Sequence, residues 1–406
     1  MRTNEIIFGE LYAISSRNGI YKPREFHGRG TKIVNMGELF GYDFIGDQPM
    51  ERIDLTPDEA QKSVLEDGDL LFGRRSLVEA GAGKCSIVIQ PSEPLTFESS
   101  IIRVRLDRQK VNPRYLFYYF KSPRGRGRIS AIVSGTNVKG IRSSDLEKVL
   151  VAVPERDNQD AVCSVLGVFD QLIAKNRRRI ELLEQSARLL FKEWFVHLRY
   201  PGHEHDKVVD GVPNGWARVN LSEMSDIGRG ASPRPINLFM GGTVPWFKIG
   251  DATASESPFV FESKEHVSQE GAKRSVFLKA GSLIISNSAT CGLPCFTGID
   301  GCIHDGWLYF REMRRVGQYF LYCFFHSKRN ELVNSVSDGS TQKNLNTDAA
   351  GRLSLVLPET DQLAVEFETI ARPQFVQISI LAKQNMALRK ARDLLLPKLM
   401  DGRLLV

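Results

Sequence analysis

The sequence predicts an α+β protein in which two mixed α/β domains are joined by two long helices packed as an antiparallel coiled coil, with a pseudo-twofold internal repeat. Two observations support this fold class. A seven-residue apolar period in the middle of the chain returns at its end, and short motifs recur in the same order about two hundred residues apart. The expected segments are a first domain, a central helix, a linker, a second domain and a C-terminal helix, at residues 1–153, 154–200, 201–216, 217–357 and 358–406.

The central helix carries a coiled-coil seam. Neither Pro nor Gly interrupts the chain between Asn176 and Arg199, and apolar side chains recur every three or four residues, which places them on one face of a helix. Asn176 is the polar member, and two interpretations are open: it fixes the register of the helix pair at a cost in stability, or the helix leaves it exposed. The seam positions are Leu166, Phe169, Ile173, Asn176, Ile180, Leu183, Leu190 and Trp194.

Residues 358–404 follow the same plan and supply a partner for the central helix. Both segments begin with Pro-Glu, at residues 154 and 358, and an Ala-Arg pair at residue 187 recurs at residue 391. Because one apolar stripe cannot be buried alone, we expect the two helices to pack against each other. The second seam contains Phe367, Ile378, Leu381, Leu388 and Leu395.

The two domains contain the same motifs in the same order. Residues 68–71 (GDLL) precede residues 281–284 (GSLI) by 213 positions, and residues 135–141 precede the matching stretch 339–345 by 204. Chance matches rarely keep such an order. The sequence therefore predicts one unit that is present twice, with a twofold axis relating the copies.

Composition excludes several classes of protein. With 42% hydrophobic and 25% charged residues, the chain has enough apolar side chains for two or three domains. The N-terminal stretch has no apolar leader, and no apolar run reaches the roughly 18 residues that cross a bilayer. Six cysteines without a leader fit a reducing compartment. We therefore expect a cytoplasmic protein with no membrane contact, and the net charge of +6 weakly favours an anionic partner.

Three stretches of sequence resemble a known family. They are RRRIELLEQSARLLFKEWFVHLRYPGHE (177–204), GRGASPRPINLFMGGTVPWFKIGDAT (228–253) and RKARDLLLPKLMDGRL (389–404). Each is similar to a segment of the specificity subunits of type I restriction-modification systems. The first domain is similar mainly through LEDGDLLFGR and SGTNVKGI, and the likeness covers essentially the whole chain.

The resemblance implies a DNA-recognition subunit without chemistry of its own. Its two target recognition domains each recognise one half of a split, asymmetric site in double-stranded DNA, while the helices set the spacer between the halves. The implied protein partners are two modification (methyltransferase) subunits and the restriction (ATP-dependent endonuclease) subunits. No cofactor is expected in this chain, because S-adenosylmethionine, ATP and Mg act in the partner subunits.

The sequence lacks the motifs of an independent enzyme. Gly81-Ala82-Gly83-Lys84 resembles the end of a phosphate-binding loop, but Val78 stands where the first Gly is needed and Cys85 where Ser or Thr is needed. Residues 112–115 (NPRY) miss an adenine methyltransferase motif by one position, and residues 262–264 (ESK) lack the upstream Pro-Asp of a nuclease. A free-standing methyltransferase or nuclease is therefore improbable.

Candidate DNA contacts are loop residues that combine positive charge with hydroxyl and amide groups. Arg pairs with guanine and Asn with adenine, and basic groups neutralise phosphates. The alternative for any one of them is an ordinary surface residue. In the first domain they are Arg17, Lys22, Arg24, Arg74, Arg75, Lys84, Thr136 and Lys139. In the second domain they are Arg229, Arg234, Trp246, Lys248, Asn287, Ser288, Thr290, Thr341 and Lys343.

Three further patterns leave alternatives open. The basic run Lys121 to Arg128 is either a phosphate clamp or a solvated loop. The stretches 134–141 and 338–345 either contact DNA or are turns that enter a strand. Cys291, Cys295, Cys302 and His304 are either zinc ligands or free thiols, and their spacing fits no common zinc pattern.

We interpret the chain as a sequence-recognition subunit whose domains recognise different half-sites, since Arg74 and Arg75 align with Ser286 and Asn287. The alternatives are an orphan DNA-binding module and a coiled-coil scaffold that binds only protein. The scaffold would show no salt-sensitive affinity for DNA.

Overall fold

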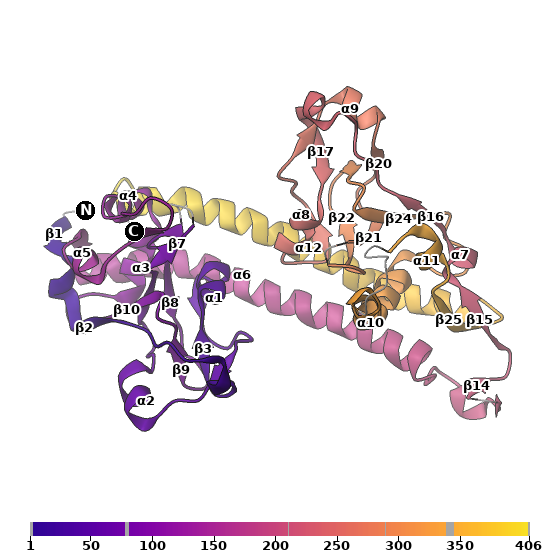
Figure 1. Cartoon of the computed structure of the whole chain (residues 1–406), viewed down its shortest axis with the longest axis horizontal. Coiled ribbons are helices and arrows are strands. Elements are labelled where there is room, and N and C mark those ends of the chain that lie inside the picture. The colour runs from indigo at the N-terminus through magenta and orange to yellow at the C-terminus, as the bar shows by residue number, and fades with distance from the viewer. Residues whose placement is uncertain (1–2, 78–80, 210, 289, 338–344, 405–406) are drawn as a thin grey trace. The chain divides into compact units, whose positions relative to one another are not determined.

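The structure, a computed structural model, describes residues 3–77, 81–209, 211–288, 290–337 and 345–404. The chain forms two compact units. Unit 1 comprises Met1–Gln171 and Arg389–Val406, and unit 2 comprises Leu172–Leu388. Each unit contains one mixed α/β domain and one stretch of each long helix (Figure 1).

Unit 1 is built on a five-stranded sheet with the order β2-β10-β6-β8-β4 and a three-stranded sheet with the order β5-β3-β9. Strand β1 pairs with β12, and β7 pairs with β11, both antiparallel. The strands are β1 (Thr3–Ile7), β2 (Tyr12–Asn18), β3 (His27–Val34), β4 (Phe44–Ile45), β5 (Arg52–Ile53), β6 (Leu70–Gly73), β7 (Arg75–Ser76), β8 (Cys85–Val88), β9 (Leu95–Phe97), β10 (Ile101–Leu106), β11 (Lys139–Gly140) and β12 (Leu150–Pro154). The short helices are α1 (Met36–Gly41), α2 (Pro57–Ser63), α3 (Pro113–Lys121), α4 (Pro123–Ser130) and α5 (Ser143–Glu147).

Unit 2 has a five-stranded sheet with the order β16-β24-β21-β22-β18 and a four-stranded sheet with the order β19-β17-β23-β20. Strand β15 pairs with β25, and a short hairpin joins β13 to β14. The strands are β13 (Val208–Val209), β14 (Val212–Pro213), β15 (Trp216–Asn220), β16 (Asp226–Arg229), β17 (Met240–Phe247), β18 (Phe259–Val260), β19 (His266–Val267), β20 (Val276–Leu278), β21 (Leu283–Ser286), β22 (Pro294–Thr297), β23 (Gly301–Ile303), β24 (Trp307–Arg311) and β25 (Ser354–Pro358). The short helices are α7 (Leu221–Met224), α8 (Ile249–Ala254), α9 (Gln269–Lys273), α10 (Gln318–Ser337) and α11 (Thr347–Gly351).

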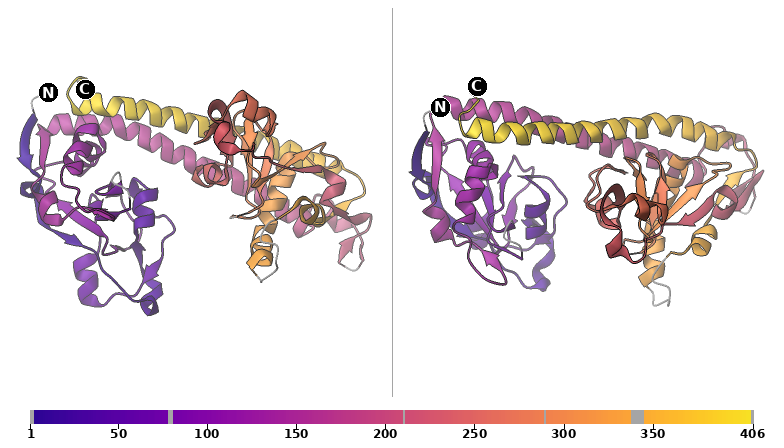
Figure 2. Two further views of the ribbon diagram at one scale, coloured as in Figure 1. Left: turned by 45° about the horizontal axis from the view of Figure 1, so that its top comes forward. Right: turned by 90° about the horizontal axis from the view of Figure 1, so that it is seen from above.

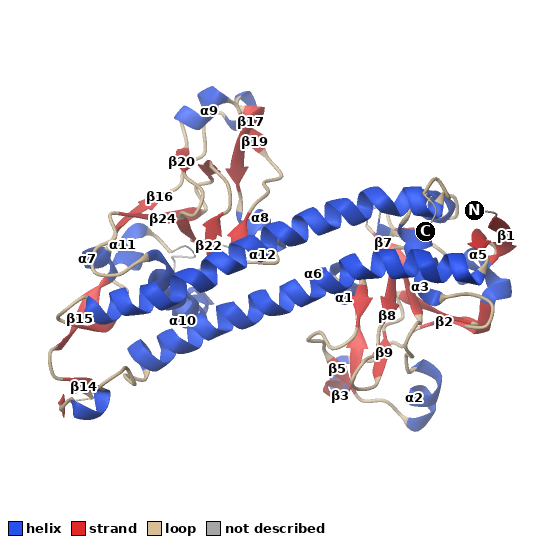
Figure 3. Ribbon diagram, turned by 180° about the vertical axis from the view of Figure 1, so that it is seen from behind, coloured by secondary structure: helices blue, strands red, loops and turns tan. Residues whose placement is uncertain are grey.

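The predicted internal repeat is confirmed by the strand order. The five-stranded sheets match strand for strand, with β6 equivalent to β21 and β10 equivalent to β24. The β1-β12 pair of unit 1 recurs as the β15-β25 pair of unit 2. Figure 3 shows that the strands of each unit lie beside that unit's own stretch of the long helices. The predicted α+β fold with two mixed domains and two long helices is therefore correct.

The continuous apolar runs in the strands follow from burial on both faces of the sheet. In β6, Leu70 and Phe72 belong to one core cluster, which includes α3, while Leu71 belongs to a second cluster with strands β3 and β9. Successive side chains of a strand point to opposite faces, so a strand covered on both faces is apolar at every position. The equivalent strand β21 is likewise buried along its whole length.

The long helices are α6 (Arg156–Phe191), which continues as a short π-helical turn over Lys192–Val196, and α12 (Gln362–Met400). In unit 1, Leu166 of α6 shares a core cluster with Leu396 and Leu399 of α12. In unit 2, Ile180 and Phe191 of α6 share a cluster with residues of α12 that include Leu381 and Phe367. Residue numbers rise along α6 as they fall along α12, so the helices are antiparallel within each unit (Figure 2).

The predicted seam positions are buried to different degrees. The buried apolar members are Leu166, Ile173, Ile180, Trp194, Phe367, Ile378 and Leu381. The remaining apolar members are half-buried, namely Phe169, Leu183, Leu190, Leu388 and Leu395.

Asn176 lies in the seam and is buried, which decides between its two interpretations. Its Nδ2 donates to Oδ1 of Asn385 at 3.0 Å, and Nδ2 of Asn385 donates to the backbone oxygen of Ile173 at 3.4 Å. The exposed alternative is wrong. A buried polar pair of this kind is satisfied in only one register, so it selects the alignment of α6 against α12 in unit 2.

A tyrosine on the helix after each five-stranded sheet is bound by a carboxylate of α6. In unit 1, Tyr118 donates to Asp170 Oδ2 at 2.5 Å, and Arg392 of α12 donates to Asp170 Oδ1 at 2.6 Å. In unit 2, the equivalent Tyr322 donates to Glu184 Oε1 at 2.9 Å. These bonds fasten each domain to its own stretch of helix.

Removing one member of the Asn176–Asn385 pair is expected to destabilise the protein more than removing both. Asn176→Ala leaves a buried amide oxygen without its donor, at a cost of about 1–3 kcal/mol in the free energy of unfolding. The double substitution of both residues by Leu removes the polar groups together and is expected to recover most of that loss. Urea unfolding of the full chain measures both. Equal destabilisation by the two variants would contradict the assignment.

His326 of α10 is expected to make unit 2 less stable in acid. Burial, with nearby Arg188 and Arg329, lowers its pKa from 6.5 to about 4. The unfolded chain therefore binds a proton that the folded chain does not, so the free energy of unfolding falls as pH drops from about 6.5 to about 4, by at most about 3 kcal/mol.

Thermal unfolding measured across this pH range tests the effect. His326→Gln should reduce the loss of stability of unit 2 between pH 6.5 and pH 4. His205→Gln, at an exposed position whose side chain is 83% accessible, should leave it as in the wild type.

Candidate functional site

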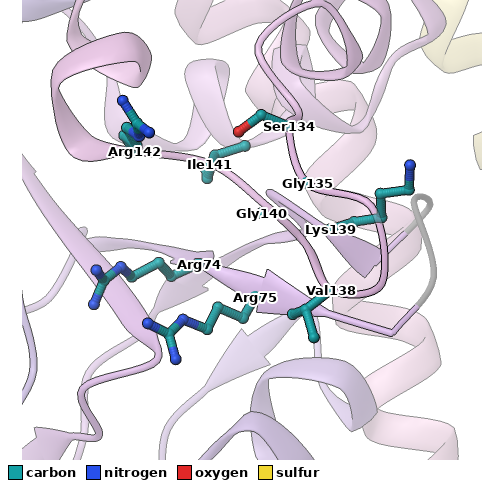
Figure 4. Close-up of a pocket in the computed structure, with 9 residues that line it drawn as sticks. All are labelled: Arg74, Arg75, Ser134, Gly135, Val138, Lys139, Gly140, Ile141 and Arg142. Atoms are coloured by element: carbon teal, nitrogen blue, oxygen red, sulfur yellow. The ribbon is translucent and has the colours of Figure 1, made fainter.

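Unit 1 contains a pocket of about 300 Å³ beside the β7-β11 pair. Figure 4 shows its lining, which is formed by the end of β6, the loop before β11 and the residue before α5. The lining residues are Arg74, Arg75, Ser134, Gly135, Val138, Lys139, Gly140, Ile141 and Arg142.

The loop at residues 134–140 has a conformation that requires glycine at two positions. Gly135 has φ +104°, a backbone conformation that other residues rarely adopt. A Cβ on Gly140 would lie 2.7 Å from the backbone oxygen of Arg74. The backbone amide of Ile141 donates to that same oxygen at 3.0 Å, which holds the loop against β6. The stretch is therefore the turn into a strand that one interpretation predicted, and it also lines the pocket.

The pocket gathers four cations, Arg74, Arg75, Lys139 and Arg142. Among the described residues, none of the four side chains forms an ion pair. Figure 4 shows the guanidinium groups of Arg74 and Arg75 extending from the strand in the same direction. Unpaired arginines are free to bind phosphate oxygens or a guanine edge.

The basic run Lys121 to Arg128 is not a loop, which corrects that interpretation, because it spans the end of α3 and most of α4. Pro at the first helical position and the Ser122 side chain, which accepts from the amide of Gly125 at 3.2 Å, start helix α4 there. Lys121 pairs with Asp43. Arg124 and Arg128 both pair with Glu5. Lys121 therefore has a carboxylate of its own, whereas Arg124 and Arg128 share the one of Glu5.

The other five candidates of the first domain lie outside the pocket. Lys22 pairs with Glu59 at 2.7 Å, and Lys84 donates to the backbone oxygen of Phe40, where burial lowers its pKa. Arg17 lies on β2 at the edge of a second pocket with Arg103 and Arg105. Arg24 lies exposed in a 3-10 turn. Thr136 is exposed in the loop before Lys139.

In unit 2, several candidates converge on Asp305, in the turn between β23 and β24. The backbone oxygen of Asp305 accepts from Arg229 Nε at 2.8 Å and from Asn287 Nδ2 at 2.9 Å. Its carboxylate pairs with His304 at 2.8 Å and lies 3.9 Å from Arg234. The sequence did not single out Asp305, since an isolated Asp in a turn carries no distinctive pattern.

Trp246 and Lys248 complete this cluster. The Trp246 ring packs against His304 with ring centroids 5.2 Å apart, and Lys248 Nζ lies 4.9 Å over the Trp246 ring. Lys248 also pairs with Glu265 at 2.5 Å. Burial lowers the pKa of His304 from 6.5. Lys248 thus pairs with a carboxylate and Arg234 lies near one, whereas Arg229 is bound by a backbone oxygen. The four cations of the unit 1 pocket have no carboxylate partner among the described residues.

Several sequence expectations for the second domain need correction. Arg229 and Trp246 lie within strands β16 and β17 rather than in loops. Trp246 and Asn287 are 2% exposed, so their side chains are not presented to a partner on this surface. Ser288 and Thr290 are half-buried after β21. Thr341 and Lys343 lie outside the described residues.

The alignment of Arg74 and Arg75 with Ser286 and Asn287 is wrong by one residue. The amide of Ile141 donates to the backbone oxygen of Arg74, and the amide of Leu345 donates to that of Asn287 at 2.8 Å. Arg74 is therefore equivalent to Asn287, and Arg75 to Ser288. The separation of 213 residues between the GDLL and GSLI motifs gives this same equivalence.

The cysteines and histidine of the second domain do not gather. Cys291, Cys295 and Cys302 belong to three different core clusters, and burial raises the pKa of each thiol. Within the described ranges, no group of three or more His, Cys, Asp or Glu side chains is placed to hold a metal ion. No described helix is long and apolar enough to cross a membrane.

Sequence analysis missed Arg142, which borders the pocket. It occupies the N-cap position of α5, and its side chain makes no capping hydrogen bond. Arg is a poor residue at this position, where Ser, Thr, Asp and Asn are preferred. An Arg before a short Ser-Ser-Asp-Leu helix is the signal that could have identified it.

The comparisons with known proteins place the chain in a family. The family model described as the type I restriction modification DNA specificity domain matches residues 13–185 and again residues 213–367. The chain therefore belongs to this family, and it contains two copies of the domain.

Relatives match over nearly the full length. The MjaIX type I restriction enzyme specificity subunit of Methanocaldococcus jannaschii is 25% identical over 95% of this chain and 89% of its own. The HindI specificity subunit of Haemophilus influenzae is 23% identical over 91% and 93%. The crystal structure of a type I restriction-modification S subunit from M. genitalium has a TM-score of 0.58 at 16% identity, covers 98% of this chain and 96% of its own, and shows the same fold.

Replacing Arg142 by Asn is expected to stabilise unit 1. In unit 2 the equivalent Asn346 caps α11 by accepting from the amide of Ala349 at 2.7 Å. An Asn at position 142 can cap α5 in the same way, a gain of about 1 kcal/mol in the free energy of unfolding. Urea unfolding measures the difference, with Arg142→Ala, which offers no cap, as the control. Equal stability of the two variants would contradict the capping argument.

Proposed function

We propose that this chain is the sequence-recognition subunit of a type I restriction-modification complex and recognises an asymmetric, two-part DNA site. The observation that carries the proposal is the duplication of the DNA specificity domain, with one copy in each structural unit. Two domains of one fold but different polar chemistry would recognise two different half-sites.

The chain is non-catalytic in this proposal. It directs adenine methylation by two modification subunits and cleavage by restriction subunits, which hold S-adenosylmethionine, ATP and Mg. The long helices connect the two recognition domains and so limit the length of the DNA spacer between the two half-sites. Shape and deformability of DNA add to recognition, so the residues alone do not specify the target bases.

A protein-only scaffold is the weaker candidate. Its helices would account for α6 and α12, but it gives no role to the four cations of the unit 1 pocket, which have no acidic partner among the described residues. A DNA-recognition domain needs such groups, because neutralised phosphates supply much of the affinity.

Methylation mapping tests the proposal. The chain is co-expressed with the modification subunit from its own locus, and methylated adenines are mapped across the host genome with and without this chain. We expect a new motif with two short specified halves around a fixed gap. Exchange of residues 217–357 for those of a relative should change one half only.

The control is a modification subunit that is shown to be active and soluble. If that subunit adds no new motif in the presence of this chain, the recognition role is wrong and the scaffold becomes the better explanation.

A further inference from the structure

The two units place different chemistry at equivalent positions around the pocket. The matched hydrogen bonds of Ile141 and Leu345 set the equivalence. By this equivalence, the three arginines of unit 1 correspond to neutral residues of unit 2. The pairs are Arg74 with Asn287, Arg75 with Ser288, and Arg142 with Asn346. The equivalent of Lys139 lies outside the described residues.

Two of the neutral residues of unit 2 serve the fold. Asn287 is buried and donates to the backbone oxygen of Asp305 at 2.9 Å. Asn346 caps α11. In unit 1, the side chains of Arg74 and Arg142 make no such bond to the described residues, and Arg142 leaves α5 without a side-chain cap. The arginines therefore occupy positions where the fold itself would be better served by neutral residues.

Two of the three neighbouring cations of unit 2 lie beside carboxylates. Arg229 donates to the backbone of Asp305, Arg234 lies near its carboxylate, and Lys248 pairs with Glu265. A cation already bound to a carboxylate releases few counterions when it meets a phosphate. The unit 1 pocket offers cations with no such partner among the described residues.

We infer that the electrostatic part of DNA binding is concentrated in unit 1, where Arg74, Arg75 and Arg142, together with Lys139, bind backbone phosphates, while the positions of unit 2 equivalent to the three arginines supply no cation for such contacts. The inference rests on the proposed function. It assigns the phosphate contacts to named residues and predicts that the two domains contribute unequally to salt sensitivity.

The test gives unit 1 the residues of unit 2. The full chain carrying Arg74→Asn, Arg75→Ser and Arg142→Asn is assembled with its modification subunits, and the Kd for a duplex holding the mapped motif is measured between 50 and 200 mM salt. Each lost phosphate contact lowers the slope of log Kd against log salt by about 0.9. We expect the slope to fall by about 2.7. The factor by which Kd rises between 50 and 200 mM salt should therefore be about fortyfold smaller than in the wild type.

A matched control removes the same charge from paired cations of unit 1. Arg29, Lys62 and Arg108 pair with Asp54, Asp58 and Asp67, and their joint replacement by Gln should change the slope much less. Urea unfolding of both variants establishes that each is folded.

The outcomes separate the inference from the proposed function. Equal slopes for the triple variant and the control would overturn the inference. If the triple variant keeps the wild-type slope and loses affinity only for duplexes with one particular base pair, the arginines contact a base edge and the phosphate assignment is wrong. A wild-type chain that directs no new methylation motif contradicts the proposed function instead, and the slope on an unrelated duplex still tests the phosphate contacts.

Discussion

The structure depends on mutual burial of the apolar stripes of α6 and α12. Neither stripe could be buried by its own helix, and each unit buries its share by pairing one stretch of α6 with one stretch of α12. The domains then attach to this pair through α3 and α10, whose tyrosines bind carboxylates of α6. Because both units use the same helix pair, a single duplicated sequence builds two supported domains.

Duplication preserved the backbone and changed the polar groups. The tyrosine position is kept as Tyr118 and Tyr322, yet Asp170 is replaced by Gln374 at the equivalent position of α12, and the acid that binds the tyrosine in unit 2 is Glu184. The Gln374 side-chain oxygen is buried and has no hydrogen-bond partner among the residues that the structure describes. The same holds at the pocket. The backbone amide of Ile141 donates to the backbone oxygen of Arg74 in unit 1, and the amide of Leu345 donates to that of Asn287 in unit 2, so the backbone bond is kept while the side chain changes from Arg to Asn. Divergence at fixed backbone positions suits a protein that must recognise two different targets.

Much of the fold was predictable because it rests on periodic patterns. The heptad spacing of Leu166, Ile173 and Ile180 predicted their burial, and the repeated order of motifs predicted matching sheets. The candidate site was predictable only in part. Arg74, Arg75 and Lys139 are brought together by the pairing of β7 with β11. Lys22, Arg124 and Arg128 are bound by Glu59 and Glu5, which are distant in sequence, and no local pattern predicts such ion pairs.

The sequence by itself determined the family, the duplication and the two helices, because apolar periodicity and motif order are properties of the linear chain. The tertiary structure decided which cations are available, because ion pairing depends on side chains that only folding brings within 4 Å of one another. Which cations near the pocket lack a carboxylate partner among the described residues is therefore a property of the folded unit.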